Sequence, residues 1–121
     1  MLENKIASLL PFIPSGPNFE SSRKLFAELS FEELWARDGY AQFQSGHCGF
    51  ILQSFDNHDF ASNLMVKIIV ADLDHWWKTM SEKQLGVRYP GFRMNPPKDF
   101  PWGREVNFID LAGVCWHVAE S

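Results

Sequence analysis

The stretch Pro96-Pro97-Lys98-Asp99-Phe100-Pro101-Trp102-Gly103-Arg104-Glu105 is the part of the sequence that most narrows the fold. It is too rich in proline to form a helix, so it predicts a loop. Residues 105–110 and 114–119 are strand-like, and Asp110-Leu111-Ala112-Gly113 predicts a turn between them. The C-terminal part of the chain therefore predicts two strands that follow a proline-rich, aromatic loop.

The residues before this loop extend the pattern to a β-α-β-β-β unit. Residues 64–70 form a β-branched run that is typical of a strand. Asp72 is placed to cap a helix over 73–85, and Gly86 is a fitting residue to end it. Residues 87–92 predict a further strand, so the second half of the chain is expected to contain one helix and four strands.

The first half predicts the same order of elements. An apolar run over 9–13 predicts its first strand, and Asn18 can cap a helix whose apolar residues recur at helical spacing. Asp38-Gly39 is a strong signal for a tight turn between strands. Three strands are expected after the helix, over 31–37, 40–44 and 49–55.

These two units predict one α+β domain over residues 1–121, with pseudo-repeat halves at about 8–62 and 63–119. Such a unit does not easily bury both faces of its strands alone, so two β-α-β-β-β modules are expected to pair. One face of the strands would pack on a helix. The other would form a curved mixed sheet around a cleft, where a ligand would bind.

The composition excludes several classes of protein. The chain of 121 residues is 45% hydrophobic and 15% aromatic, which is typical of a packed globular domain. Its net charge of −4 and pI near 5.5 argue against nucleic acid as a partner. The N-terminal segment resembles neither a signal peptide nor a membrane span, so a cytoplasmic protein without membrane contacts is expected. The two cysteines, Cys48 and Cys115, form no C-x-x-C pair, which predicts free thiols.

Three segments carry a resemblance to a known family, namely residues 71–77, 96–105 and 110–117. They resemble bleomycin-resistance-type members of the vicinal-oxygen-chelate superfamily, which also contains glyoxalases and dioxygenases. The likeness covers about residues 8–121, and the proline-tryptophan-glycine loop is its most specific element. The family's common D-P-x-G turn has Leu111 in place of the proline. The resemblance implies a homodimer, because the relatives commonly assemble their cleft across a two-fold interface.

The resemblance also implies four places for metal-binding side chains, which fall at Pro11, Gln53, Met65 and His117. Proline has no donor atom, and the thioether of Met65 is a soft ligand that suits copper(I) better than Zn²⁺, Ni²⁺ or Fe²⁺. Two remaining ligands are too few for such an ion. A shift of one residue would bring Phe12 or Leu10 to the first place, which coordinate no better. We therefore expect no bound metal and no cofactor.

The expected pocket follows from the alternation of side chains along strands, because residues two apart face the same way. If Gln53 faces the cleft then Phe55 does too, and the same holds for Met65 and Lys67. Lys67 is either a fixed positive charge in the pocket or a side chain that extends to solvent at the sheet edge. Trp102 could close over a flat ligand by stacking. The full set of expected ligand-binding residues is Trp35, Gln53, Phe55, Met65, Lys67, Trp102, Phe108 and His117.

No catalytic residues are predicted, because no base, nucleophile and orienting group are recognisable together. Cys115 shares a strand face with His117, which leaves a thiolate–imidazole pair as a minor alternative. The expected function is therefore sequestration of a planar organic molecule, by analogy an antibiotic of the bleomycin type. One rival is a metal-dependent lyase, isomerase or dioxygenase with a rearranged site, drawn from Gln53, His117, Glu105 and Glu120. Another is a regulatory or partner-binding domain whose own aromatic side chains fill the pocket.

Overall fold

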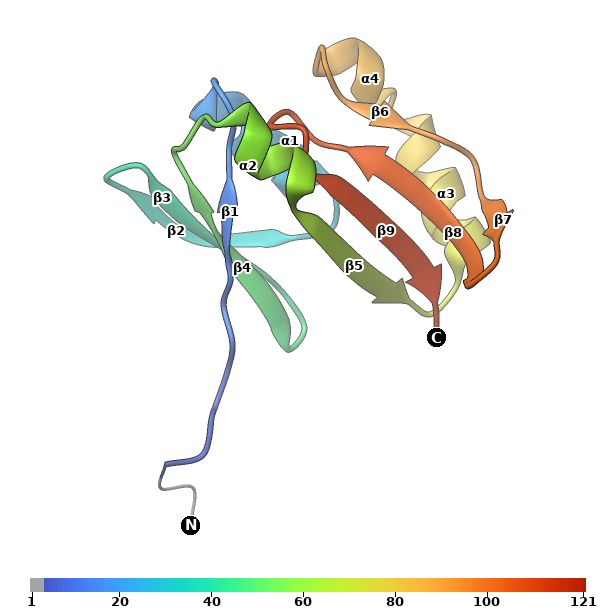
Figure 1. The fold of residues 1–121 in the computed structure, drawn as a ribbon, viewed down its shortest axis with the longest axis horizontal. Helices are drawn as coiled ribbons and strands as arrows, with labels where there is room; N and C mark the ends of the chain where they lie inside the picture. The colour runs from blue at the N-terminus through green and yellow to red at the C-terminus, as the bar shows by residue number, and fades with distance from the viewer. Residues whose placement is uncertain (1–3) are drawn as a thin grey trace.

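The structure, a computed structural model, describes residues 4–121 as an α+β fold with two mixed sheets (Figure 1). The first sheet has the order β1 (Phe12–Pro14), β4 (Cys48–Gln53), β3 (Tyr40–Ser45), β2 (Glu32–Arg37). The second has the order β5 (Met65–Val70), β9 (Cys115–Glu120), β8 (Gly103–Ile109), β6 (Arg93–Met94), and β7 (Lys98–Phe100) also pairs with β8. The helices are α1 (Phe19–Glu28), α2 (His58–Asn63), α3 (Leu73–Glu82) and α4 (Leu85–Arg88).

The two sheets repeat one plan. In each sheet the first strand runs parallel to the last, β1 to β4 and β5 to β9. The other pairings in both sheets are antiparallel. This arrangement confirms the predicted α+β class and its two β-α-β-β-β modules, and it leaves β1 and β5 as edge strands.

The predicted signals for helix starts and for one turn are confirmed. Asn18 accepts a hydrogen bond from the backbone N–H of Ser21 at 3.0 Å, and Asp72 accepts one from that of His75 at 3.0 Å. Each side chain satisfies a backbone donor that the first helical turn leaves free. Asp38-Gly39 joins β2 to β3 with φ angles of 52° and 80°, a left-handed conformation that glycine adopts without strain.

Trp116 on β9 holds the core of the two sheets together. Its ring lies 5.4 Å from that of Phe26 on α1, 5.6 Å from that of Phe50 on β4, and 5.6 Å from that of Phe108 on β8. The core is therefore built from inner side chains of both sheets with the helices. The opposite faces of the sheets carry the remaining alternate side chains.

One predicted strand is wrong. Residues 87–92 form the last two residues of helix α4 and the turn that follows it, and strand β6 begins only at Arg93. The chain reverses at Gln84, whose φ of 55° is left-handed, so α3 ends at Glu82 and not at residue 85. Arg88 then pairs with the Glu28 carboxylate, and the Tyr89 hydroxyl donates to the same carboxylate at 3.1 Å. These contacts with α1 fix a short helix where local sequence favours a strand.

Two loops contain more structure than expected. The polar segment after β4 holds α2, which Asn57 caps by accepting from the backbone N–H of Phe60 at 3.0 Å. The proline-rich loop before β8 holds the short strand β7. None of the described helices is both long and apolar enough to cross a membrane.

Candidate functional site

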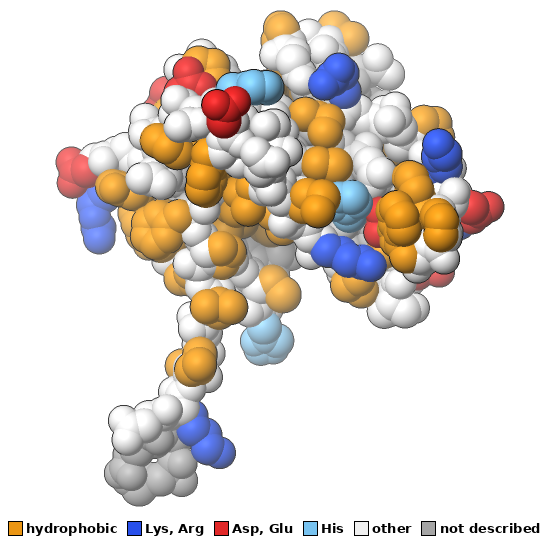
Figure 2. Space-filling view, in the orientation of Figure 1, with side chains coloured by type: hydrophobic (Ala, Val, Ile, Leu, Met, Phe, Trp, Pro, Cys, Tyr) orange, Lys and Arg blue, Asp and Glu red, His pale blue; other side chains and the backbone are white. Residues whose placement is uncertain are grey.

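The alternation of side chains gives each sheet a face that points away from the core. On the second sheet, the residues of this face follow from the strand register. We call the following group the second-sheet face: Met65, Lys67 and Ile69 on β5, Cys115 and His117 on β9, and Glu105, Asn107 and Ile109 on β8. Figure 2 shows hydrophobic side chains gathered around histidine and basic side chains over β5 and β9.

His117 is held between a carboxylate and a thiol on this face. Its Nδ1 lies 2.9 Å from Glu105 Oε1, and its Nε2 lies 3.6 Å from Cys115 Sγ. Since an ionised carboxylate only accepts hydrogen bonds, Nδ1 carries the proton and donates it to Glu105. In the neutral imidazole the lone pair of Nε2 therefore points at the thiol.

Glu105 is almost fully buried, with 3% of its side chain exposed, and neighbouring side chains compensate the negative charge of its carboxylate. Burial alone would raise its pKa, but His117, Trp102 and the nearby charge of Lys67 together hold the pKa below its ordinary value. Lys67 Nζ lies 3.7 Å from Glu105 Oε2 while half of the lysine side chain stays exposed. The carboxylate is thus ionised at neutral pH, and Lys67 offsets its charge.

Asn107 supplies a polar atom with no partner. Its Oδ1 is buried and makes no hydrogen bond to any of residues 4–121. Asn107 is the register partner of His117, so it lies at the centre of the second-sheet face. Buried acceptors in folded proteins nearly always have a donor, and one supplied by a ligand would satisfy this atom.

Two aromatic rings lie at the Glu105 end of this polar centre, one on β7 and one in the turn that follows it. Phe100 and Trp102 stack with centroids 5.0 Å apart and an interplanar angle of 11°. Trp102 lies in the turn between β7 and β8 and is 63% exposed. An exposed flat ring beside hydrogen-bonding groups suits a planar ligand that stacks on one side and donates on the other.

The first sheet has an open face of its own, made by Phe12, Trp35, Tyr40, Gln42, Ile51 and Gln53. The Trp35 indole N–H donates to Gln42 Oε1 at 2.9 Å, and the Arg37 guanidinium lies 4.7 Å from the Trp35 ring. Phe55, beyond the end of β4, packs edge-on against Phe60 of α2 at 5.7 Å. This first-sheet face is therefore also aromatic.

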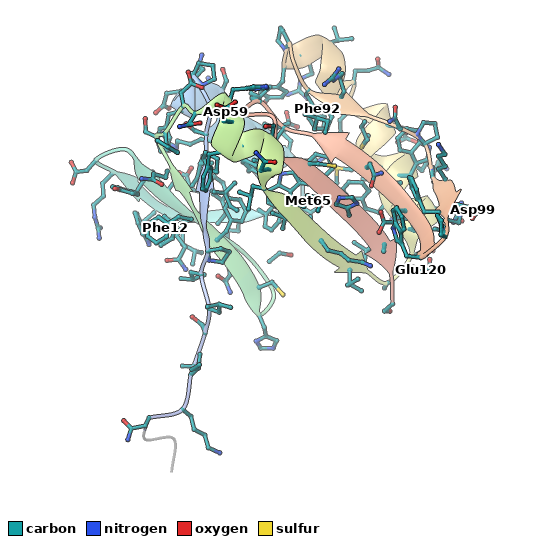
Figure 3. The ribbon with its side chains drawn as sticks, in the orientation of Figure 1. Phe12, Asp59, Met65, Phe92, Asp99 and Glu120 are labelled. Atoms are coloured by element: carbon teal, nitrogen blue, oxygen red, sulfur yellow. The ribbon has the colours of Figure 1, made fainter. Side chains whose placement is uncertain are left out.

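The predicted site residues divide between these two faces. Met65, Lys67 and His117 lie on the second-sheet face with Trp102 beside them, while Trp35, Gln53 and Phe55 belong to the first sheet. Within residues 4–121, no hydrogen bond, ion pair or aromatic contact joins these two groups. Figure 3 labels Phe12 and Met65, which begin the edge strands β1 and β5 of the two sheets.

The expected orientation of Phe108 is wrong. This ring is 1% exposed and stacks between Trp116 and Trp76, with Trp116 at 5.6 Å and Trp76 at 6.2 Å. Phe108 alternates with Asn107 along β8, so it faces the core when Asn107 faces out. The polar–apolar alternation Glu105, Val106, Asn107, Phe108 was the sequence signal that could have placed it correctly.

The first of the four implied metal-ligand positions, assigned to Pro11, also lies elsewhere than predicted. Pro11 lines an apolar hollow of about 410 Å³ between the two sheets, together with Ile13, Val66, Ile68 and Trp116 among others. Phe12, the register partner of Ile51, takes the position on the first-sheet face instead. Its ring has no donor atom, so the predicted alternative for this place coordinates no better.

The donor atoms present do not fit the metal site that the resemblance implies. Of the four places, only Gln53 and His117 carry donors that suit Zn²⁺, Ni²⁺ or Fe²⁺. Both ring nitrogens of His117 already face protein partners. In the part of the chain that the structure describes, no group of three or more His, Cys, Asp or Glu side chains could hold a metal ion. We therefore derive no chemistry from a metal here.

Sequence reasoning missed how closely several residues cooperate. Glu105 entered only as a possible ligand of a rearranged metal site, and Asn107 and Phe100 were not singled out. The period of two along residues 103–109 places Glu105 and Asn107 on the same face, and this signal was available. The pairing of Phe100 with Trp102 was not, because it depends on a short strand inside a loop that was predicted to be irregular.

No family sequence model matches the chain, and no curated protein matches it in sequence. Solved structures do match over nearly the whole chain. A bleomycin-binding protein complexed with bleomycin has a TM-score of 0.79 at 17% identity, covering 96% of this chain and 99% of that chain. The bleomycin-binding protein from bleomycin-producing Streptomyces verticillus, complexed with copper(II)-bleomycin, has a TM-score of 0.76 at 20% identity, covering 97% and 98%.

The similar structures also include a lyase and a superfamily member described by its fold family alone. Lactoylglutathione lyase from Agrobacterium tumefaciens has a TM-score of 0.68 at 12% identity, covering 98% of this chain and 96% of that chain. A member of the glyoxalase/bleomycin resistance protein/dioxygenase superfamily from Sphaerobacter thermophilus has a TM-score of 0.64 at 19% identity, covering 96% and 98%. The chain has the fold of this superfamily, as the sequence resemblance predicted.

Proposed function

We propose that this chain, built on the glyoxalase/bleomycin-resistance/dioxygenase fold, binds a flat organic molecule and sequesters it without holding a metal. The observation that carries the proposal is the buried, unpartnered Oδ1 of Asn107 beside the exposed stack of Phe100 and Trp102. A planar ligand with an N–H or O–H group would stack on Trp102 and donate to Asn107. Binding of this kind needs no reaction.

The charges of the site narrow the ligand class. Glu105 and Lys67 lie 3.7 Å apart and offset each other, so the centre of the second-sheet face does not require a strongly charged ligand. The free acceptor favours amides, amines and phenols over purely apolar molecules. Similar structures include bleomycin-binding proteins, so an antibiotic of the bleomycin type is the first compound to test.

The metal-dependent enzyme is the rival, and the donor set disfavours it. A lyase, isomerase or dioxygenase of this fold would need more ligands than Gln53 and His117 supply, because Phe12 has no donor atom and Met65 offers only a soft thioether. Glu105 is already hydrogen-bonded to His117. The third possibility, a domain whose pocket is filled by its own rings, fits poorly with the exposed Trp102 and the hollow between the sheets.

We also propose a homodimer, because apolar side chains remain uncovered along one side of the chain. Residues 4–9 extend away from both sheets (Figure 1), with Ile6 86% and Leu9 82% exposed. Met65 on the edge strand β5 is 68% exposed. A second copy would bury these residues and bring a first-sheet face next to a second-sheet face.

Quenching of tryptophan fluorescence tests the binding proposal on protein treated with a chelator. Bleomycin and a panel of other flat compounds would be titrated into the wild type, Trp102→Ala and Asn107→Leu. Loss of one stacking partner is expected to weaken binding about tenfold in Trp102→Ala. Asn107→Leu should weaken binding of donor-bearing compounds while leaving the fold equally or more stable, since it removes an unsatisfied buried acceptor.

Val87→Ala provides the control, because Val87 is an exposed apolar residue on α4, away from both open sheet faces. Its affinity for each compound should equal that of the wild type. The proposal fails if no flat compound binds, if Trp102→Ala and Asn107→Leu bind as tightly as the wild type, or if binding requires an added metal ion.

A further inference from the structure

The second-sheet face holds a thiol, an imidazole and a carboxylate in a hydrogen-bonded series. Cys115 Sγ lies 3.6 Å from His117 Nε2, and His117 Nδ1 lies 2.9 Å from Glu105 Oε1. The carboxylate is almost fully buried, the imidazole is mostly buried, and the thiol is half-buried. A nucleophile, a base and a group that orients the base, each within hydrogen-bond reach of the next, form the arrangement that activates thiols and hydroxyls in enzymes.

Glu105 determines which imidazole nitrogen of His117 carries the proton, and base catalysis depends on this. Because the buried carboxylate accepts the Nδ1 proton, the other imidazole nitrogen is free to accept the proton of the thiol. The hydrogen bond from His117 does most to lower the pKa of Glu105, and Lys67, 3.7 Å from the other carboxylate oxygen, lowers it slightly further. Glu105 is therefore a positioning residue that acts through His117.

The thiol does not exist as a stable thiolate at neutral pH. Burial raises the pKa of Cys115, and the negative charges of Glu105 and Asp110 raise it further. Attack by sulfur therefore requires that the proton leave as the new bond forms. His117 Nε2 is the base within reach of that proton.

The neighbours of Cys115 select the kind of electrophile. Met65 and Ile109 are its register partners on the two adjacent strands, so apolar side chains flank the sulfur. Lys67 is the register partner of His117 and places an ammonium group on the same face. An uncharged, flat compound with a conjugated carbonyl fits these surroundings, because its carbon skeleton is apolar and its oxygen gains negative charge when a nucleophile adds.

We propose that Cys115 captures α,β-unsaturated carbonyl compounds covalently, with His117 as the base and Glu105 positioning it. The Sγ–C bond forms at the β-carbon, and the π-electron pair of the C=C bond moves to give an enolate whose oxygen faces Lys67. The thiol proton passes to His117 Nε2 and then to the α-carbon. The product is a thioether, formed without a leaving group or an oxidant, with one equivalent captured by each chain.

N-Ethylmaleimide is a suitable probe, since it is a small, flat, conjugated carbonyl compound. Peptide mass spectrometry would follow its addition to Cys115, with the exposed Cys48 of the same chain as the internal reference. His117→Gln is expected to slow addition at Cys115 about 100-fold, the size of a typical general-base effect, while the rate at Cys48 stays unchanged. Glu105→Gln should also slow the Cys115 reaction, because it removes the carboxylate that orients the His117 imidazole.

Addition to Cys115 at the wild-type rate in folded His117→Gln protein would overturn the proposal. If His117→Gln does not fold, the wild type provides the test in heavy water. Removal of the thiol proton during attack predicts a slower reaction at Cys115 in heavy water than in ordinary water, with no such slowing at Cys48. The same ratio of addition rates in ordinary and heavy water at both cysteines would contradict the proposal.

This inference concerns the same face as the proposed function, and Cys115→Ser separates the two. The variant should lose covalent capture yet keep the reversible affinity of the wild type for flat compounds. Covalent capture without any reversible binding would sink the sequestration proposal alone. Reversible binding with no dependence of Cys115 on His117 would sink the capture proposal alone.

Discussion

Glu105 is the residue on which the charges of the second-sheet face depend. It is buried near the start of β8, it accepts from His117, and its Oε2 lies 3.7 Å from Lys67 Nζ. Removing such a carboxylate leaves the donor of His117 and the lysine charge without their partner. The same residue thus couples the stability of the sheet to the state of the site.

Glu105→Gln is expected to lower the free energy of unfolding by about 2 kcal/mol at pH 7, the usual value for a hydrogen bond to a charged group. The pKa of Glu105 in the fold lies below its ordinary value, so its contribution is present above the unfolded pKa and is lost as pH falls through the folded pKa. The difference between wild type and variant should therefore shrink as pH falls below 4.5, the ordinary pKa of a glutamate side chain.

Urea unfolding at a series of pH values would measure this difference. Glu32→Gln is the matched control, because Glu32 is an exposed carboxylate on β2. That variant should match the wild type throughout. A Glu105→Gln penalty that stays constant or grows as pH falls below 4.5 would contradict the assignment of an ionised, paired carboxylate.

The turn between β8 and β9 is the element that sets the register of the second-sheet face. Asp110 Oδ1 accepts from the backbone N–H groups of Ala112, Gly113 and Val114 at 2.9–3.1 Å. Its Oδ2 accepts from the Trp116 indole at 2.8 Å. Since a slip of one residue would turn every side chain to the opposite face, this carboxylate also determines which residues reach a ligand.

Asp110→Ala is expected to lower the free energy of unfolding by about 3 kcal/mol, because it leaves several buried hydrogen-bond donors without an acceptor. The midpoint of urea unfolding checks this value, and Asp56→Ala in the exposed loop after β4 is the control that should unfold like the wild type. If Asp110→Ala were as stable as the control, Asp110 would not be what fixes the turn.

The two halves of the molecule leave their open faces apart within one chain, which is why the oligomeric state matters for function. The extended residues 4–9 carry Ile6 and Leu9 in largely exposed positions. A second copy that covers them would complete a cleft from two chains. The proposed dimer thus links the arrangement of the sheets to the binding of a ligand between them.

Light scattering coupled to size-exclusion chromatography is expected to find a dimer of the wild type at micromolar concentration. Ile6→Asp/Leu9→Asp should shift the protein towards the monomer, because charge would have to be buried in the interface. Val87→Asp introduces the same change at an exposed apolar residue of α4 and should leave the dimer intact. A monomeric wild type, or equal masses for all three proteins, would rule out this interface.

The sequence was informative wherever local chemistry decided the structure. Asn18 and Asp72 cap helices because their own side chains satisfy nearby backbone donors, and Asp38-Gly39 turns because its φ angles are positive. The strand predicted over 87–92 failed because its conformation depends on Glu28, about sixty residues away. The predicted orientation of Phe108 was wrong because its strand face was assigned one residue out of step, which the local polar–apolar alternation could have corrected.

The candidate site was only partly predictable for the same reason. Met65, Lys67 and His117 were placed on one face by the period of two along their strands, as the register has them. The hydrogen bond from His117 to Glu105 required knowing that β8 lies beside β9, and the stack of Phe100 on Trp102 required β7. Whether these residues bind a ligand stays a prediction.

Metal content measured by plasma mass spectrometry tests the central claim most directly. The purified protein would be analysed before and after incubation with Ni²⁺, Zn²⁺, Mn²⁺ and Fe²⁺ and removal of loosely bound ions. Because the donors at the implied places are too few, near-zero occupancy per chain is the expected result. One tightly held ion per chain would contradict the metal-free proposal and favour the enzyme.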